Sequence, residues 1–208
     1  MRKIIIFGTS GHAKVVAEAI IKMNKFDLLG FIDNKKSNTN KDVYKGYKIL
    51  GDDDVIISLF KVFPDLLAHI GVGDNKIRKK IFKKFSYLQF PTIIHPSSTI
   101  SNDVTIDDGS FVGSSVSIIN GSQIGKHVIL NTASSIDHDT KILDFSFISP
   151  NTSIAGNVKI EENVFVGTGV KIIPNVTIKN GSIIGAGATV IKNVEANLTV
   201  IGTPAKKK

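Results

Sequence analysis

The sequence predicts two folds in one chain, a small α/β domain followed by a parallel β-helix. Two observations predict this. Strand-like and helix-like segments alternate up to about residue 90, and from residue 94 an aliphatic residue recurs at every sixth position. Alternating strands and helices are typical of α/β folds, and six-residue repeats are typical of parallel β-helices. We therefore assign residues 1–90 to the first domain and residues 91–208 to the second.

Three strands alternate with three helices in the first domain. Runs rich in β-branched residues predict strands at 3–8, 27–33 and 66–73. Apolar residues at helical spacing predict helices at three further places: 12–23, 51–63 and 76–85. The inner face of the first helix is expected to carry Val15, Val16, Ala19, Ile20 and Met23, and that of the third helix Ile77, Ile81 and Phe85. This order predicts a parallel sheet with crossover helices.

The second domain repeats with a period of six. Every sixth residue from Ile94 to Val190 is Ile, Val or Leu, and a small or β-branched residue follows each of them four places later. Aliphatic side chains at this period point into the axis of a β-helix, and stacked coils bury them as one column. We expect the recurrent Gly, Asn and Asp residues between the repeats to form the corners, including Gly113, Gly125, Gly156, Gly167 and Gly185.

Composition excludes several classes of protein. The chain has no cysteine, which excludes disulfide scaffolds, thiolate zinc sites and cysteine nucleophiles. No apolar run reaches the length of a membrane span, and the apolar start is too short for a signal peptide, so we expect a cytoplasmic protein. The net charge of +8 suits an anionic partner, either nucleic acid or nucleotide phosphates. The basic run at 76–85 also fits a merely solvated helix face.

The segment at 8–13, "GTSGHA", lies between a predicted strand and a helix, where a phosphate-binding turn belongs. Ser10 and Ala13 replace two of the glycines of the dinucleotide-binding pattern. The segment is therefore weak evidence for a dinucleotide, and an ordinary tight turn is the alternative.

Adjacent His138 and Asp139 lie within the repeats. An imidazole titrates near neutrality and suits a general base, and a carboxylate beside it can orient the ring and raise its basicity. Neighbours on an extended strand point in opposite directions, so the pair needs a bent corner to meet. The alternative is a solvated corner, because turns are rich in such residues.

Four segments carry a family resemblance: "IIIFGTSGHAKVV", "GFIDN", "IGVGDNKIRKKI" and "NTASSIDHD". In this order they resemble the bacterial sugar acetyltransferases that join a small Rossmann-like domain to a left-handed β-helix. These enzymes N-acetylate nucleotide-linked 4-amino-4,6-dideoxy sugars or O-acetylate sialic acid. The resemblance implies acetyl-CoA as co-substrate, no metal, and a homotrimer with active sites between subunits. It implies neither a nucleic acid nor a membrane as partner.

The resemblance also implies roles for individual residues. Acetyl transfer would use His138 as general base and Asp139 as its partner. The nucleotide-linked sugar would contact Ser10, Gly11, His12, Asp33, Asn34, Asp74, Arg78 and, beside the dyad, Asn131. Acetyl-CoA would pass along Phe147, Ala155, Gly156, Gly167, Thr168, Gly185 and Ala186.

Phe147 departs from the family pattern. Family N-acetyltransferases commonly have a second histidine nine residues after the base, in contact with the thioester, and Phe147 occupies that place here. We predict an acetyl-CoA-dependent N-acetyltransferase of a nucleotide-linked 4-amino-4,6-dideoxy sugar in surface-glycan biosynthesis. Phe147 favours the O-acetylation of a sialic-acid-like sugar as an alternative. A catalytically inactive sugar-nucleotide-binding scaffold is the alternative of another class.

Overall fold

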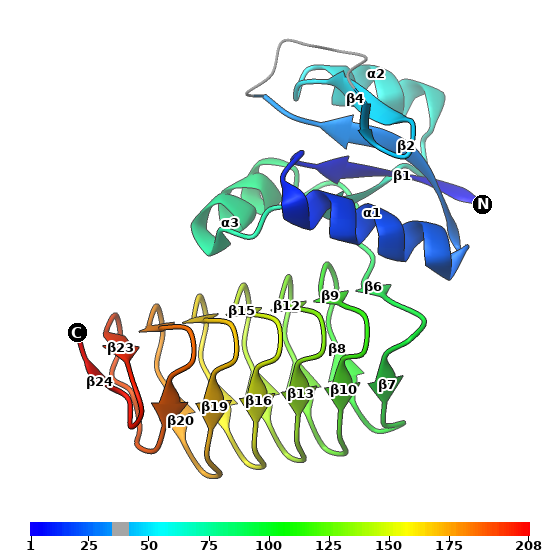
Figure 1. The fold of residues 1–208 in the computed structure, drawn as a ribbon. Helices are drawn as coiled ribbons and strands as arrows, with labels where there is room; N and C mark the ends of the chain where they lie inside the picture. Colours follow the sequence, from blue (N-terminus) through cyan, green and yellow to red (C-terminus); the bar gives the residue numbers. More distant parts are fainter. Residues whose placement is uncertain (35–41) are drawn as a thin grey trace. The chain divides into compact units, whose positions relative to one another are not determined.

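A computed structural model describes residues 1–34 and 42–208 (Figure 1). The chain forms two compact units, Met1–Pro96 and Ser97–Lys208. Our sequence-based division at residue 90 lies slightly before this boundary. Within the described ranges, no helix is both long enough and apolar enough to span a bilayer.

The first unit contains a five-stranded sheet in the order β3-β4-β2-β1-β5. The predicted strands are β1 (Arg2–Phe7), β2 (Phe26–Ile32) and β5 (Leu67–Ile70), and they pair in parallel as expected. The hairpin of β3 (Asp42–Tyr44) and β4 (Tyr47–Gly51) was not predicted from the sequence, and it makes the sheet mixed. Its turn residues Lys45 and Gly46 both have positive φ, the geometry of a two-residue hairpin loop.

Among the described residues of this unit, three helices connect the strands: α1 (Gly11–Met23), α2 (Val55–Val62) and α3 (Asn75–Lys84). The apolar faces differ from the prediction in two places. On α1 the residue Val15 is exposed, and Ala13 and Ala17 are buried instead. On α3 the residue Ile77 is 45% exposed, whereas Arg78 is only 1% exposed. Helical spacing alone did not reveal that the guanidinium of Arg78 lies on the buried face, where backbone carbonyls accept its hydrogen bonds.

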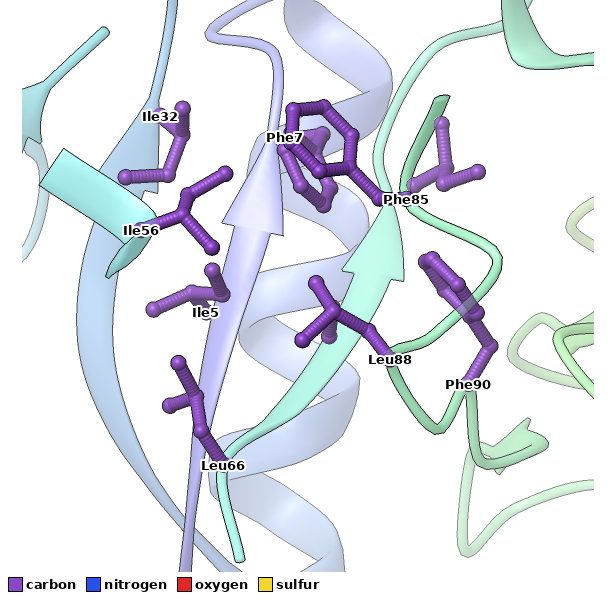
Figure 2. Packing of buried hydrophobic residues seen from close by; sticks show 10 residues of the cluster. Ile5, Phe7, Ile32, Ile56, Leu66, Phe85, Leu88 and Phe90 are labelled. Carbon is purple, nitrogen blue, oxygen red and sulfur yellow. The ribbon is translucent and has the colours of Figure 1, made fainter. Parts of the chain in front are cut away.

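The core on one face of this sheet joins side chains from strands, helices and the segment after α3 (Figure 2). Figure 2 shows Ile5 and Phe7 of β1 between Ile32 on one side and Phe85 on the other, with α1 behind the sheet. The Phe7 and Phe85 rings stack with centroids 4.8 Å apart. This packing fixes β1, whose carboxyl end leads into the predicted phosphate-binding turn.

The second unit is a parallel β-helix built almost entirely of two-residue strands (Figure 1), as predicted. Partner residues on successive coils are 18 positions apart, as in the pairing of Ser117 with Ser135, so three six-residue repeats make one coil. Three sheets result. The first face comprises β7 (Thr99–Ile100), β10 (Ser117–Ile118), β13 (Ser135–Ile136), β16 (Ser153–Ile154), β19 (Lys171–Ile172) and β22 (Thr189–Val190). The second face comprises β8 (Thr105–Ile106), β11 (Gln123–Ile124), β14 (Lys141–Ile142), β17 (Lys159–Ile160) and β20 (Thr177–Ile178).

The third face runs through β9 (Phe111–Val112), β12 (Ile129–Leu130), β15 (Phe147–Ile148), β18 (Phe165–Val166), β21 (Ile183–Ile184), β23 (Thr199–Ile201) and β24 (Lys206–Lys207). A further two-residue strand, β6 (Ile93–Ile94), lies at the end of the first unit. The predicted aliphatic column is buried at every sixth residue from Val112 to Val190. Ile100 and Ile106 belong to the first coil and are only half-buried.

The residues that form the corners differ from the prediction in one respect. Of the glycines expected to form them, Gly156 lies in a turn, whereas Gly113, Gly125, Gly167 and Gly185 each lie between a strand and a turn; none of the five has a positive φ. The left-handed conformation instead recurs at every sixth residue from Gly109 to Gly187 and is taken mostly by Gly or Asn. Asn tolerates this conformation better than most residues because its short polar side chain bonds locally. One exception to the Gly and Asn rule is Asp139, with φ of 58°.

Candidate active site

The turn between β13 and β14 brings His138 and Asp139 together. The Nδ1 atom of the imidazole lies 2.9 Å from Oδ2 of the carboxylate. The left-handed conformation of Asp139 supplies the bent corner that this contact requires, because an extended backbone would point the two side chains apart. Both side chains face solvent, 58% exposed at His138 and 68% at Asp139. The three faces of the β-helix form a prism, and we call its edge between the first and second faces the dyad edge.

Carboxylates raise the pKa of His138 above its ordinary value. The hydrogen bond from Nδ1 to Asp139 is the largest cause, desolvation opposes it, and the charges of Asp137 and Asp139 add smaller contributions that raise the pKa. Asp137 also fixes the turn, since its Oδ1 accepts a hydrogen bond of 2.8 Å from the backbone N–H of His138. Asp137 was not predicted from the sequence, although its acidic side chain directly precedes the candidate base.

Neighbouring coils present glycines to the dyad. The backbone N–H of Asn157 donates to the carbonyl of His138, so Ala155 and Gly156 lie on the next coil at the same edge. On the preceding coil, Gly121 lies against the carboxylate, and a Cβ there would be 2.5 Å from Oδ1 of Asp139. Two of the predicted acetyl-CoA residues, Ala155 and Gly156, are therefore close to the dyad.

The remaining residues predicted on the β-helix lie elsewhere on the prism. The edge between the third and first faces, which we call the glycine edge, carries those that follow β12, β18 and β21: Asn131, Gly167, Thr168, Gly185 and Ala186. Asn131 uses its Oδ1 to accept from Thr132 N at 2.8 Å. We expected Asn131 in the groove of the dyad, but within one chain the first face separates the two edges. The roles of these residues in binding the sugar and acetyl-CoA stay predictions.

Phe147 points outward from the third face, the one opposite the dyad edge of the prism. Its ring stacks on Phe165 of the next coil with centroids 5.3 Å apart. The side chain at the place of the expected second histidine therefore packs in an aromatic column. Within one chain it is remote from the His138 imidazole.

The polar residues predicted in the first unit gather at the carboxyl edge of its sheet. Thr9 Oγ1 donates to Asp33, Ser10 Oγ donates to the carbonyl of Gly71 at 3.2 Å, and Asn34 Oδ1 accepts from Asp53 N at 2.8 Å. These bonds tie together the turns after β1, β2, β4 and β5. Thr9 and Asp53 were not among the predicted residues, because nothing in their spacing marks them. Open α/β sheets bind ligands at this edge.

The turn after β5 is anchored at both of its ends. Asp74 caps α3, and its Oδ1 accepts from Ile77 N at 2.9 Å. Arg78 folds back beneath the turn and donates to the carbonyls of Val72 and Gly73, both at 3.1 Å, and to Asn75 Oδ1 at 2.9 Å. We expected Arg78 to offer charge to an anionic ligand. It lies instead inside the fold, where the turn takes these hydrogen bonds.

Two histidines whose ring nitrogens are buried accompany Arg78. Burial, with the charges of His69 and Arg78, lowers the pKa of His12 to about 3. Burial also lowers the pKa of His69 to about 4, against a hydrogen bond to the carbonyl of Pro91 that raises it. Gly11, at the first position of α1, faces open space, since a Cβ there would meet no atom within 4 Å. The turn after β1 thus offers an open backbone above a neutral imidazole.

A β-helix with a His–Asp pair on an open edge, preceded by an α/β unit with a polar carboxyl edge, defines a transferase of the hexapeptide-repeat class. The family models agree: the PglD N-terminal domain matches residues 3–85, and the bacterial transferase hexapeptide model (six repeats) matches residues 157–192. The chain belongs to the PglD-type family of hexapeptide-repeat sugar N-acetyltransferases, as two solved structures described below show over the full chain.

The first of these structures is a histidine-to-asparagine mutant of perosamine N-acetyltransferase from Caulobacter crescentus, in complex with CoA and GDP-perosamine. It is 30% identical, has a TM-score of 0.93, and covers 100% of this chain and 97% of its own. The second is the acetyltransferase domain of PglB from Neisseria gonorrhoeae FA1090 in complex with acetyl coenzyme A. It is 31% identical, has a TM-score of 0.91, and covers 100% and 99% of the two chains.

A curated relative matches a shorter segment. UDP-N-acetylbacillosamine N-acetyltransferase of Bacillus subtilis (strain 168) is 32% identical over 116 residues, which cover 54% of this chain and 51% of that protein. The chain thus spans about half the length of the curated relatives that it matches. The family resemblance noted in the sequence is confirmed.

Proposed function

We propose that this protein is an acetyl-CoA-dependent N-acetyltransferase of a nucleotide-linked 4-amino-4,6-dideoxy sugar, acting in the cytoplasm in surface-glycan biosynthesis. One observation carries the proposal: an exposed imidazole whose Nδ1 lies 2.9 Å from a carboxylate on an open prism edge. The relatives named above that act on GDP-perosamine and on a UDP-linked amino sugar support this choice of substrate class.

The dyad can perform the proton transfers of direct acetyl transfer. With Nδ1–H donated to Asp139, the Nε2 lone pair of His138 accepts a proton from the attacking sugar amine. The nitrogen forms a bond to the thioester carbonyl carbon, and the C–S bond of acetyl-CoA then breaks. The imidazolium returns its proton to the leaving sulfur, so free CoA and an N-acetylated sugar result. A base whose pKa lies near neutrality suits this step.

Each unit would bind one of the two substrates. The carboxyl edge of the α/β sheet suits the nucleotide, with Ser10, Gly11 and His12 along the phosphates and sugar. There Asp33 and Asn34 would meet the ribose or base. Acetyl-CoA would lie along the β-helix, where small residues such as Gly167 and Gly185 let a long thin ligand approach the backbone.

A homotrimer accounts for the separation of the predicted residues. The dyad edge and the glycine edge belong to the same prism but face different directions, so one chain alone does not assemble them. Packing three prisms side by side would place the dyad edge of one copy against the glycine edge and Phe147 of another. Mixing His138→Ala chains with Thr168→Arg chains tests this, since only a shared site restores activity in the mixture.

A thiol-release assay tests the activity itself. Purified protein is given acetyl-CoA and, one at a time, UDP-, dTDP- and GDP-linked 4-amino sugars, with sialic acid as a further acceptor. We expect CoA release and a product heavier by one acetyl group with at least one amino sugar. Release with sialic acid alone would replace the N-acetyl proposal by O-acetylation, which Phe147 favours. No release with any acceptor would leave the sugar-nucleotide-binding scaffold.

A further inference from the structure

The glycine at position 156 is unusual for its place in the repeat. Every sixth residue from Asn102 to Ala186 occupies the same corner position, and Gly156 is the only glycine among them. Its φ lies outside the left-handed region, so the backbone there does not require glycine. Neither the turn nor the repeat therefore explains why this corner lacks a side chain.

The ring of His138 explains it. A Cβ added to Gly156 would overlap Nε2 of His138 and lie 2.5 Å from Cε1 and 2.9 Å from Cδ2. Cβ atoms essentially never come this close to other heavy atoms, so the ring would have to move. Because the imidazole is the end of an exposed side chain, it can swing away at little cost to the fold. It would then leave the position in which Nδ1 meets Asp139.

We propose that Gly156 is a positioning residue for acetyl transfer. Because it has no side chain, the ring of His138 has room to lie against Asp139. Gly121 makes the same kind of room below Asp139, with its missing Cβ 2.5 Å from Oδ1. Gly121 also has a φ of +71°, so substitution there would strain the backbone as well. Gly156 is therefore the cleaner place to test the idea.

The charged groups that act on the ring are Asp137 and Asp139, both from its own turn. The coils on either side present Asn120, Gly121, Gly156 and Asn157, which do not titrate. A displaced ring loses mainly the Asp139 hydrogen bond, so the pKa of His138 should fall back toward its ordinary value in Gly156→Ala. The five histidines of the chain make this measurable by NMR titration, with His138→Ala identifying the signal.

Kinetics of Gly156→Ala form the second arm, which rests on the proposed function. A misplacement of about 1 Å can cost about 10²-fold, so we expect kcat to fall by about that factor while KM for acetyl-CoA stays near its wild-type value. In a His138→Asn background the same substitution should change kcat no further, because both act through one ring. A raised KM for acetyl-CoA with unchanged kcat would overturn the proposal and make Gly156 a cofactor contact.

Controls separate this inference from the proposed function and from misfolding. Asn180→Ala places alanine at the same corner position away from the dyad and should leave both kcat and the titration unchanged. If the wild type acetylates no acceptor, the proposed function fails, yet the titration still decides the position of the ring. If Gly156→Ala lowers the unfolding midpoint, that loss must disappear in a His138→Ala background. An equal loss in both backgrounds, or an unchanged titration, rejects the proposal.

Discussion

The ionisable side chains at the two candidate sites, one on each unit, lie in opposite environments. In the α/β unit His69 and Arg78 are buried, as are the ring nitrogens of His12, and desolvation is the main cause that lowers each pKa. In the β-helix His138 lies in solvent, and neighbouring carboxylates raise its pKa. A group that must exchange protons needs access to its substrate, whereas a group that holds a turn gains from being enclosed.

This contrast predicts that substitutions in the two units affect different properties, stability in one and the rate of acetyl transfer in the other. His69 and Arg78 of the α/β unit make hydrogen bonds to backbone carbonyls, so their removal should appear in stability. The dyad contributes one exposed ion pair, which stabilises a protein little. Its removal should appear in the rate of acetyl transfer.

Replacing His138 by Ala should separate rate from stability most clearly. Loss of a general base costs about 10²- to 10⁴-fold in kcat. The unfolding midpoint should stay at the wild-type value, because the ring is 58% exposed and its bond to Asp139 is solvated. Steady-state kinetics and thermal unfolding of the same sample measure both. A near-native rate would remove His138 from the mechanism.

Arg78→Met should produce the reverse phenotype. The substitution preserves the apolar stem but leaves the carbonyls of Val72 and Gly73 without their donor. We expect a loss of about 2–4 kcal/mol in the unfolding free energy of the α/β unit. Urea unfolding followed by the circular dichroism of the helices measures it. Lys80→Met, an exposed neighbour on α3, is the matched control and should change stability little.

Mild acid should destabilise the α/β unit through its buried histidines. His12 and His69 have folded pKa values of about 3 and about 4, whereas an unfolded chain binds protons near the ordinary value of 6.5. Between pH 6.5 and 5 the unfolded state therefore binds more protons, and stability falls as the pH falls. The slope approaches about 1.4 kcal/mol per pH unit for each histidine.

The measurement is the urea midpoint of the helix signal across this pH window, above the range in which most carboxylates titrate. His69→Gln should reduce the slope by one histidine. His138 acts in the opposite direction, since its raised pKa adds stability below 6.5 that is lost as the pH rises through the folded value. A midpoint that does not change between pH 6.5 and 5 would mean that the two buried rings are protonated in the folded state.

The units also differ in how far the sequence predicted them. In the β-helix each residue's place depends on one period, so the buried column and the corner position of His138 were both readable. In the α/β unit the burial of Arg78 depends on acceptors in a turn that only the folded chain assembles. The β3–β4 hairpin escaped notice because its strands are short and its turn, Lys45–Gly46, does not match the commonest hairpin sequences.

The part of the site that was predictable consists of residues that are adjacent in the sequence. His138 and Asp139 are adjacent, and a bent corner was enough to join them. The separation of Asn131 from the dyad was not predicted; Asn131 follows β12 and the dyad follows β13, so they lie on different edges of one coil. The steric role of Gly156 was invisible, since it depends on a residue 18 positions earlier in the coil stack. Thr9 and Asp53 depend likewise on pairing across the sheet.

The smallest predicted effect concerns the interior of the β-helix itself. Ser146 lies at a buried corner, where its Oγ donates to the carbonyl of Glu161 at 2.8 Å and accepts from Val164 N at 3.2 Å. Ser134 is equally buried, yet its Oγ has no hydrogen-bond partner among residues 1–34 and 42–208. Both are small-residue positions of the repeat, so the pair isolates the hydroxyl contacts from the packing.

Ser146→Ala should lower the unfolding free energy of the β-helix by about 1–3 kcal/mol, because a buried carbonyl and a buried N–H lose their partner. Ser134→Ala removes only an unpaired hydroxyl and should leave stability unchanged or slightly higher. Urea unfolding of both variants against the wild type measures the difference. Equal losses would mean that the volume of the oxygen atom stabilises these corners. The polar interior of the β-helix would then be held by packing, whereas that of the α/β unit is held by its hydrogen bonds.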